Sequence, residues 1–283
     1  DQHAELAIKR VITGAIALPL LILFVLKASY VLFASFVVVL TFLGLSEYYR
    51  MALPDRRAEG VAASLAGALI PAFLAAQDRI IEMVPFRTSS TLLAFALTIV
   101  FLAFALRVLF SFRDVRSAAA ETALFATGFL YVPLLLTHLA WLRALPDGVG
   151  WIFLVLVIVM SGDTAAYYVG SNLGRHKLYP SVSPNKSVEG AIGGLLGSLA
   201  GTFVARLTFF PGLTVLDCIA TALLLGVLGQ VGDLFESLLK RSFGVKDSGT
   251  IVPGHGGILD RLDSILFAVP AAYYYALFVF MNR

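Results

Sequence analysis

Hydrophobic residues along the chain come in blocks of about 20 residues, separated by short breaks that contain charged residues, Pro or Gly. A helix needs roughly 20 apolar residues to cross a hydrocarbon core of ~30 Å. The blocks predict nine spans, at residues 8–26, 30–46, 60–76, 90–111, 122–142, 149–170, 188–210, 214–236 and 258–281. We therefore expect an all-α fold, a polytopic integral membrane bundle of about nine transmembrane helices.

Composition strengthens this interpretation. Of the 283 residues, 59% are hydrophobic and 14% are charged, and the mean hydropathy is +0.89. Soluble globular domains are only ~45–50% apolar, so an ordinary soluble domain is excluded. The single cysteine, Cys218, excludes an intrachain disulfide, and nothing in the chain therefore requires an oxidising compartment.

The first hydrophobic block is expected to be a retained span. It starts near Ile8 and runs on without the small-residue cleavage site that ends a signal peptide. Because the chain is compact and shows no targeting extension, we expect it in the cytoplasmic (inner) membrane of a bacterium.

Lys and Arg are distributed unevenly between the two sides of the predicted bundle. With nine spans, most of the 21 Lys and Arg residues fall on the side that holds the N-terminus. The positive-inside rule then predicts a cytoplasmic N-terminus and an external C-terminus. Two long polar loops, 171–187 and 237–258, lie on the cytoplasmic side. We expect residues 1–145 to form a scaffold of about five spans and residues 146–283 to form the catalytic region.

Small residues recur four apart in the seventh span, on two adjacent helix faces. Such residues let helix backbones approach closely in lipid, and a tight helix contact is expected here. The same faces would permit a homodimer without requiring one. They are Gly190, Gly194 and Ser198 on one face, and Gly193, Gly197 and Gly201 on the other.

The longest polar stretch runs from Phe235 to Asp263 and, with the preceding Asp233, mixes both signs of charge. A basic loop alone would indicate topology and lipid headgroup contacts. Phosphoryl or nucleotidyl transfer needs carboxylates for a hard cation such as Mg²⁺ together with cations for the remaining phosphate charge. The mixture therefore indicates such chemistry, and its candidates are Lys240, Arg241, Lys246 and Arg261 among the cations, and Asp233, Glu236, Asp247, Asp260 and Asp263 among the acids.

Three of these acids are the candidate metal ligands. Asp260 and Asp263 are three apart at the start of the ninth span, which places them on one helical face, where they could share one ion or flank two. The alternative is that both are simply first-turn acids favoured by the helix dipole. Asp233 ends the eighth span, and since a carboxylate at mid-bilayer costs about 2.5–3.5 kcal/mol, it should face a wet cavity.

The glycine-rich segment Pro253–Gly257 lies between those helices. Gly256 and Gly257 can bring backbone N–H groups close to a phosphate. His255 is expected to bind substrate or to stabilise charge; the alternative is a hydrogen bond that shapes the loop.

The loop after the sixth span leads into a second candidate anion site. Ser183, Lys186 and Ser187 precede the seventh span, and Glu189 follows in its first turn. A helix N-terminus with a lysine and hydroxyls can hold a triphosphate or a base-sugar unit, although a plain Ser N-cap explains part of the pattern.

Isolated polar residues inside the spans complete the candidates. Asp163 lies in an otherwise apolar span, and it should pair with a cation or contact substrate. Tyr167 follows one turn later and is expected to bind substrate. His138 and Asp217 are expected to form helix–helix hydrogen bonds or to lie at the membrane interface.

The run from Ser237 to Asp263 resembles the signature of the CDP-diacylglycerol synthases, the phosphatidate cytidylyltransferases. The upstream stretch is similar to that family as well, and the two motifs cover roughly the C-terminal two fifths of the chain. Val252 and Ser187 depart from the usual residues but keep their chemical character. The matching positions are Ser237, Lys240, Arg241, Lys246, Asp247, Gly249, Pro253, His255, Gly256, Gly257, Asp260, Arg261 and Asp263, and upstream Asp163, Tyr167, Gly170, Ser183, Pro184, Lys186, Ser187, Glu189 and Gly190.

The resemblance implies CTP as donor, phosphatidate in the lipid bilayer as acceptor, pyrophosphate as product and Mg²⁺ as the required ion, with no nucleic acid partner. Asp233, Asp260 and Asp263 would hold one or two cations, the second of unknown identity. Alternatives are a related CTP-dependent transferase or kinase with another lipid acceptor, and an anion or phospholipid transporter. A transporter should place its polar residues near the midplane in related halves, whereas here they gather at one face.

Overall fold

The computed structural model describes residues 2–76, 98–99, 102–110, 114–251 and 256–283, with side chains described from residue 15 onward. Within these ranges the chain is almost entirely helical. A single two-stranded antiparallel hairpin, β1 (Lys177–Tyr179) and β2 (Ser183–Ser187), is present in this described part. The all-α prediction is confirmed.

Seven helices in the described part are long and apolar enough to cross a membrane. One of them is continuous through α6, a π-helical turn at Pro133 (η1, Leu130–Leu134) and α7, and the last continues from α11 into η2 (Ala276–Phe280). The others are single helices. In chain order the elements are α2 (Tyr30–Ala52), α3 (Arg57–Ala75), α6 (Val115–Phe129) with α7 (Leu135–Ala144), α8 (Gly148–Leu173), α9 (Val188–Thr208), α10 (Val215–Ser242) and α11 (Leu259–Tyr275).

Two predicted spans need separate comment. The first falls on α1 (Gln2–Lys27), a helix of 26 residues whose side chains are described only over its apolar part Ala15–Lys27. The fourth, 90–111, lies largely outside the described residues. The polytopic membrane bundle is therefore established, while the count of nine and the side of the N-terminus stay predictions.

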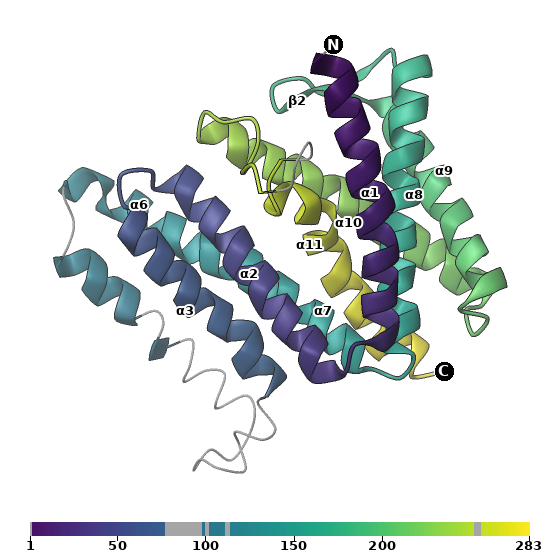
Figure 1. Cartoon of the computed structure of the whole chain (residues 1–283), viewed down its shortest axis with the longest axis horizontal. Helices are drawn as coiled ribbons and strands as arrows, with labels where there is room; N and C mark the ends of the chain where they lie inside the picture. Colours follow the sequence, from purple (N-terminus) through teal and green to yellow (C-terminus); the bar gives the residue numbers. More distant parts are fainter. Residues whose placement is uncertain (1, 77–97, 100–101, 111–113, 252–255) are drawn as a thin grey trace. The chain divides into compact units, whose positions relative to one another are not determined.

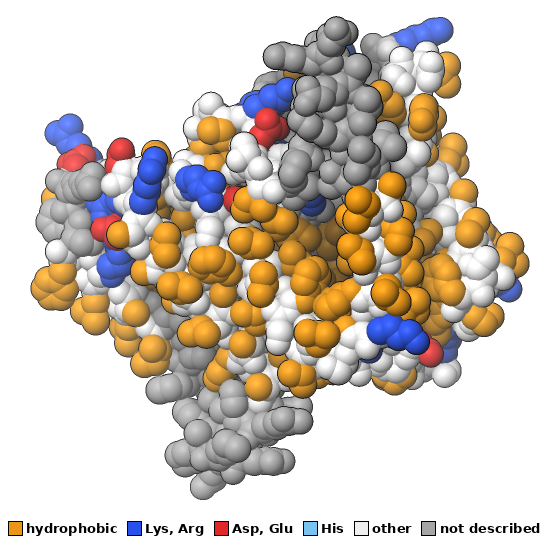
Figure 2. Space-filling model, in the orientation of Figure 1, with side chains coloured by type: hydrophobic (Ala, Val, Ile, Leu, Met, Phe, Trp, Pro, Cys, Tyr) orange, Lys and Arg blue, Asp and Glu red, His pale blue; other side chains and the backbone are white. Residues whose placement is uncertain are grey.

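The surface has the character of a chain surrounded by lipid. Large apolar side chains are exposed along the helices, for example Leu207 at 79% and Leu216 at 73%, and Figure 2 shows apolar side chains over much of the visible face. Contiguous exposed apolar surface of this kind marks a membrane or protein contact.

The chain divides into two compact units. Unit 1 joins Asp1–Phe33 to His138–Arg283, and unit 2 is Ala34–Thr137. The first helix thus groups with the C-terminal helices, where α1 contacts α8 (Figure 1). The expected scaffold role of residues 1–145 is a functional statement and stays a prediction.

Unit 2 is held together at one end of its helices by buried polar contacts. Tyr48 donates a hydrogen bond to the backbone oxygen of Leu124 at 3.0 Å, and Tyr49 donates to that of Phe125 at 2.9 Å. Arg56 pairs with Glu121 at 2.8 Å. The two tyrosines tie α2 to α6. Arg56, the residue that precedes α3, ties the start of that helix to α6 through its ion pair.

In unit 1, α8 and α9 pack closely along small residues. A Cβ added at Gly190 would lie 3.0 Å from the backbone oxygen of Ala166, and one at Gly194 would lie 3.2 Å from that of Gly162. Ser198 donates a hydrogen bond to the backbone oxygen of Ile158 on α8 at 3.0 Å. The tight contact predicted from the spacing of small residues is confirmed.

Two polar residues inside spans form the expected helix–helix hydrogen bonds. The ring Nε2 of His138 lies 3.2 Å from the Tyr274 hydroxyl. Asp217 accepts from the Tyr275 hydroxyl at 2.8 Å and also forms an ion pair with Arg283. Both residues bind other helices to α11, and Asp217 also binds α10 to the C-terminal Arg283.

Candidate active site

The β1–β2 hairpin connects α8 to α9 and is fixed to the N-terminus of α9. Ser187 caps that helix, with its hydroxyl accepting from the Gly190 N–H at 3.1 Å. The Glu189 carboxylate accepts from the backbone N–H of Arg175 at 3.1 Å and that of His176 at 3.2 Å, and lies 2.6 Å from His176 Nδ1. Glu189 therefore holds the start of the hairpin, and its oxygens are committed to this structural contact.

A cavity of about 570 Å³ lies between α8, the hairpin, α9 and α10. This volume is within the ~300–1,000 Å³ of ordinary ligand pockets. On α8 the lining residues Asp163, Tyr167 and Ser171 are four apart and form one stripe of the helix. The remaining lining residues are Ala166, Gly170, Leu178, Ser183, Asn185, Lys186, Ser187, Gly190, Ala191, Gln230 and Asp233.

Charged side chains from α8, β2 and α10 meet at one part of this cavity, and a fourth element, α11, adds charge beside them. Lys186 of β2 forms an ion pair with Asp233 of α10 at 2.6 Å. Asp163 of α8 and Asp263 of α11 both interact electrostatically with Asp233. Arg261 interacts with Asp163 as well. Lys186, Arg261 and Lys240 act on these three carboxylates. Because Lys240 is also paired with Glu236 and Asp260, the group keeps an excess of negative charge.

Gly232 explains how Asp233 comes to lie near Asp263. A Cβ at Gly232 would lie 2.5 Å from the backbone oxygen of Asp263, a separation that real Cβ atoms do not adopt, so only glycine allows α10 and α11 to approach so closely here. This close approach brings the carboxylates of Asp233 and Asp263 near each other. In the sequence, Asp233 ends the eighth predicted span and Asp263 lies at the start of the ninth.

This arrangement suits a divalent cation that is shared with substrate. No three His, Cys, Asp or Glu side chains within the described residues are placed to hold one ion by themselves. Mg²⁺ usually takes only one or two carboxylates and completes its shell with substrate phosphates and water. Asp233 and Asp263 fit this pattern, and the negative charge around them would be relieved by a cation.

A second charged cluster, formed by Glu236, Lys240 and Asp260, is buried beside the first. Lys240 Nζ lies 2.6 Å from a Glu236 oxygen and 2.6 Å from Asp260 Oδ1. The three residues are 0%, 9% and 8% exposed. The two acids therefore share a single lysine in a place that water hardly reaches.

Asp260 also holds the two described parts of the α10–α11 loop, residues 243–251 and 256–258. Its Oδ2 accepts from the Ser248 N–H and hydroxyl, both at 2.9 Å, and from the Gly257 N–H at 2.8 Å. Gly256 has φ +82°, and a Cβ there would lie 2.6 Å from Asp260 Oδ2. A carboxylate offers about four acceptor sites, so a metal role for Asp260 would require Lys240 to release Oδ1.

The structure thus separates the predicted site residues into groups. Asp163, Tyr167, Ser183, Lys186, Ser187 and Asp233 line the cavity, and Asp263 lies beside Asp233. Glu189, Lys240, Asp260, Gly256 and Gly257 make structural contacts next to it. Ser237 lies 3.5 Å from Asp233. Arg241, Lys246, Asp247 and Arg261 are exposed, and His255 lies outside the described residues.

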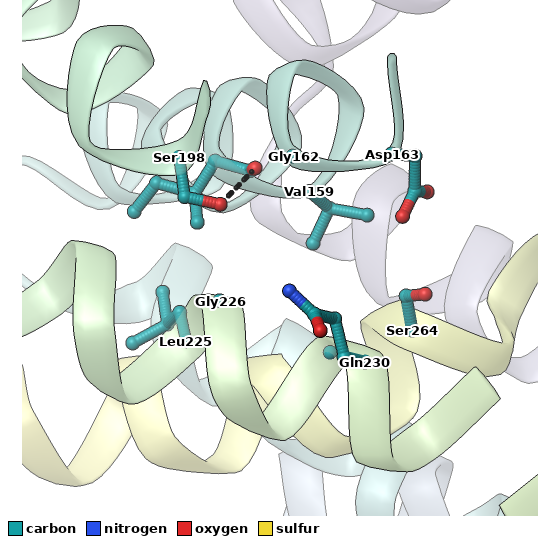
Figure 3. A pocket seen from close by; sticks show the side chains of 10 residues that line it. Val159, Gly162, Asp163, Ser198, Leu225, Gly226, Gln230 and Ser264 are labelled. Atoms are coloured by element: carbon teal, nitrogen blue, oxygen red, sulfur yellow. Dashed lines mark hydrogen bonds between the residues drawn. The ribbon is translucent and has the colours of Figure 1, made fainter. Parts of the chain in front are cut away.

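Sequence reasoning missed Gln230. Its amide nitrogen donates to the backbone oxygen of Ala191 on α9 at 3.1 Å, and the residue lines the large cavity and a small pocket of about 10 Å³. Figure 3 shows its side chain reaching from α10 into that small pocket, with Asp163 and Ser264 nearby. The signal was available, because Gln230 is a polar residue in an apolar span, three positions before Asp233.

Comparison with known proteins places the chain in a family. A family model described as the cytidylyltransferase family matches residues 8–279. Among curated relatives, the phosphatidate cytidylyltransferase of Staphylococcus haemolyticus (strain JCSC1435) is 42% identical over 161 residues, which is 57% of this chain and 58% of the relative. That of Bacillus subtilis (strain 168) is 41% identical over 155 residues, 54% of this chain and 58% of the relative.

The phosphatidate cytidylyltransferase of Staphylococcus aureus (strain COL) is 43% identical over 162 residues, again 57% of this chain and 58% of the relative. The chain thus spans 58% of the length of these relatives, whereas the family model covers nearly all of this chain. The resemblance seen in the motifs is confirmed, and the chain belongs to the cytidylyltransferase family.

Proposed function

We propose that the chain transfers a cytidylyl group from CTP to phosphatidate, forming CDP-diacylglycerol and pyrophosphate. One observation carries the proposal: Asp163, Asp233 and Asp263 come together from three membrane helices beside Lys186, at a cavity large enough for a nucleotide. Membership of the cytidylyltransferase family and the names of the relatives support the donor and the acceptor.

The reaction joins two anions that repel each other, and positively charged groups at the site would reduce this repulsion. An oxygen of the phosphatidate phosphate attacks the α-phosphorus of CTP and forms a new P–O bond. The bond between the α-phosphorus and the oxygen that bridges to the β-phosphorus breaks, and pyrophosphate leaves with that electron pair. Lys186 and the N-terminus of α9 offer positive charge to the phosphates. In-line positioning and electrostatic stabilisation supply most of the rate in such transfers.

We propose Asp233 and Asp263 as the residues that hold Mg²⁺. When bound, the ion would neutralise phosphate charge and so reduce the repulsion between donor and acceptor. Asp260, the third candidate ligand, is assigned instead to holding the α10–α11 loop through Ser248 and Gly257. Arg261, which interacts with Asp163, is proposed to neutralise further phosphate charge.

We further propose that the site faces the cytoplasm of a bacterium. The excess of Lys and Arg on the loops next to the site supports this orientation. CTP would then enter from the cytosol, while the acyl chains of phosphatidate stay in the bilayer beside the exposed apolar faces of the helices.

An acceptor panel tests the proposal. The purified protein is incubated in mixed micelles with base-labelled CTP and Mg²⁺, and with phosphatidate, diacylglycerol or no added lipid, each with and without a chelator. We expect label in the lipid phase only with phosphatidate and free Mg²⁺. Label that does not depend on phosphatidate, or no label from a preparation shown to be folded by its thermal transition, would contradict the proposal.

A further inference from the structure

The large cavity is uneven in charge along its length. Asp163, Lys186 and Asp233 gather at one part, whereas the residues further along α8 and the hairpin, among them Tyr167, Ser171 and Leu178, are neutral. The stripe from Asp163 to Ser171 covers eight positions of α8, which is ~12 Å of helix. A ligand with a charged end and a neutral end would match this division.

Tyr167 is unusual within the neutral part. Its side chain is 70% exposed although it lines the cavity. The neighbouring Tyr168 is exposed to a similar degree, 62%, but does not line it. The two rings form a T-shaped pair with centroids 5.5 Å apart and planes at 75°. A T-shaped neighbour leaves at least one face of the Tyr167 ring uncovered.

We propose that Tyr167 is a stacking platform for the cytosine base of CTP, and that the neutral part of the cavity is the nucleoside subsite. The inference rests on the proposed function and adds to it a residue that distinguishes the base from the phosphates. Bases bind readily to the face of an aromatic side chain. The amide of Asn185, which also lines the cavity, can donate to and accept from a base edge.

A competing interpretation is that Tyr167 only anchors the helix at the membrane interface, as tyrosines often do. Tyr168 supplies the matched control, because it is adjacent, has the same chemistry and is similarly exposed. An anchoring role would make the two alanine variants behave alike. A stacking role would confine the effect to Tyr167.

The test is equilibrium binding of labelled CTP and, separately, of inorganic tripolyphosphate to the purified full chain in detergent with Mg²⁺. For Tyr167→Ala we expect CTP affinity to fall about tenfold, which corresponds to ~1.4 kcal/mol and suits the loss of one stacked base. Affinity for tripolyphosphate should stay unchanged. Tyr167→Phe should retain CTP affinity, as should Tyr168→Ala.

Other outcomes overturn the inference. Equal losses for CTP and tripolyphosphate would show a role in phosphate binding or folding, and unchanged CTP affinity would show no contact with the base. Transfer activity is measured on the same samples. If the wild-type protein forms CDP-lipid but Tyr167→Ala binds CTP as tightly as the wild type does, the subsite alone is refuted. If Tyr167→Ala weakens CTP binding but the wild-type protein transfers no cytidylyl group to lipid, the proposed function alone is refuted.

Discussion

Replacing Asp263 or Asp233 by Asn is expected to reduce kcat about 10³-fold, because a bound metal contributes several kcal/mol of transition-state stabilisation. Asn keeps the shape of the side chain but removes the charge that the cation needs. Folding should be preserved, because Asn is polar and each carboxylate also lies near another acid, so the substitution relieves repulsion. Asp233→Asn additionally gives up the partly exposed ion pair with Lys186, which costs only about 1 kcal/mol. Turnover is measured as a function of Mg²⁺ concentration.

The dependence on Mg²⁺ distinguishes a ligand from a structural residue. In either variant the Mg²⁺ concentration for half-maximal turnover should rise, and high Mg²⁺ should recover part of the lost activity. Asp114→Asn, which changes an exposed capping acid in unit 2, serves as the control and should leave both quantities unchanged. Full activity with an unchanged Mg²⁺ requirement in Asp233→Asn or Asp263→Asn would contradict the assignment.

The second large effect is expected on stability, from Lys240→Met. This substitution removes the only cation that the structure shows between buried Glu236 and Asp260 in the described part of the chain. Breaking a buried ion pair by removing one partner costs about 3–5 kcal/mol, because the other charge is left uncompensated. The thermal transition of the purified protein in detergent should therefore move to clearly lower temperature.

Arg241→Met is the matched control for that measurement. Arg241 is the next residue and also basic, but it is exposed, and its guanidinium donates a hydrogen bond to the backbone oxygen of Val245 at 3.2 Å. We expect little change in its thermal transition. In a Lys240→Met, Glu236→Gln double variant one uncompensated charge is gone, and part of the stability should return. Equal transition temperatures for Lys240→Met and Arg241→Met would show that the buried cluster does not stabilise the fold.

The sequence alone predicts the helical class and several residues that line the candidate cavity. Asp163 and Asp233 are polar residues in apolar helices, and such residues must find a polar environment, so their place at a cavity follows from physical necessity. Lys186 and Ser187 were placed correctly for a similar reason, since the residues before a long apolar helix surround its N-terminus. The ion pair between Lys186 and Asp233 could not be read from the sequence.

The roles of Asp260 and Glu189 show what spacing cannot decide. Three-residue spacing places Asp260 and Asp263 on one side of α11, but it does not say that Asp260 meets Lys240 and the loop while Asp263 meets Asp233. Glu189 could equally face a ligand or the hairpin, and the short strands of that hairpin leave no periodic pattern to predict. These choices depend on loop conformation, which long-range packing determines.

The central claim concerns which part of CTP moves to the lipid, and two labels test it directly. The purified protein is given phosphatidate, Mg²⁺ and CTP labelled either at the α-phosphorus or at the γ-phosphorus. Cytidylyl transfer predicts that the α label enters the lipid phase while the γ label is released into water as pyrophosphate. Appearance of the γ label in lipid, with the α label left in water, would show phosphoryl transfer by a lipid kinase and would contradict the account.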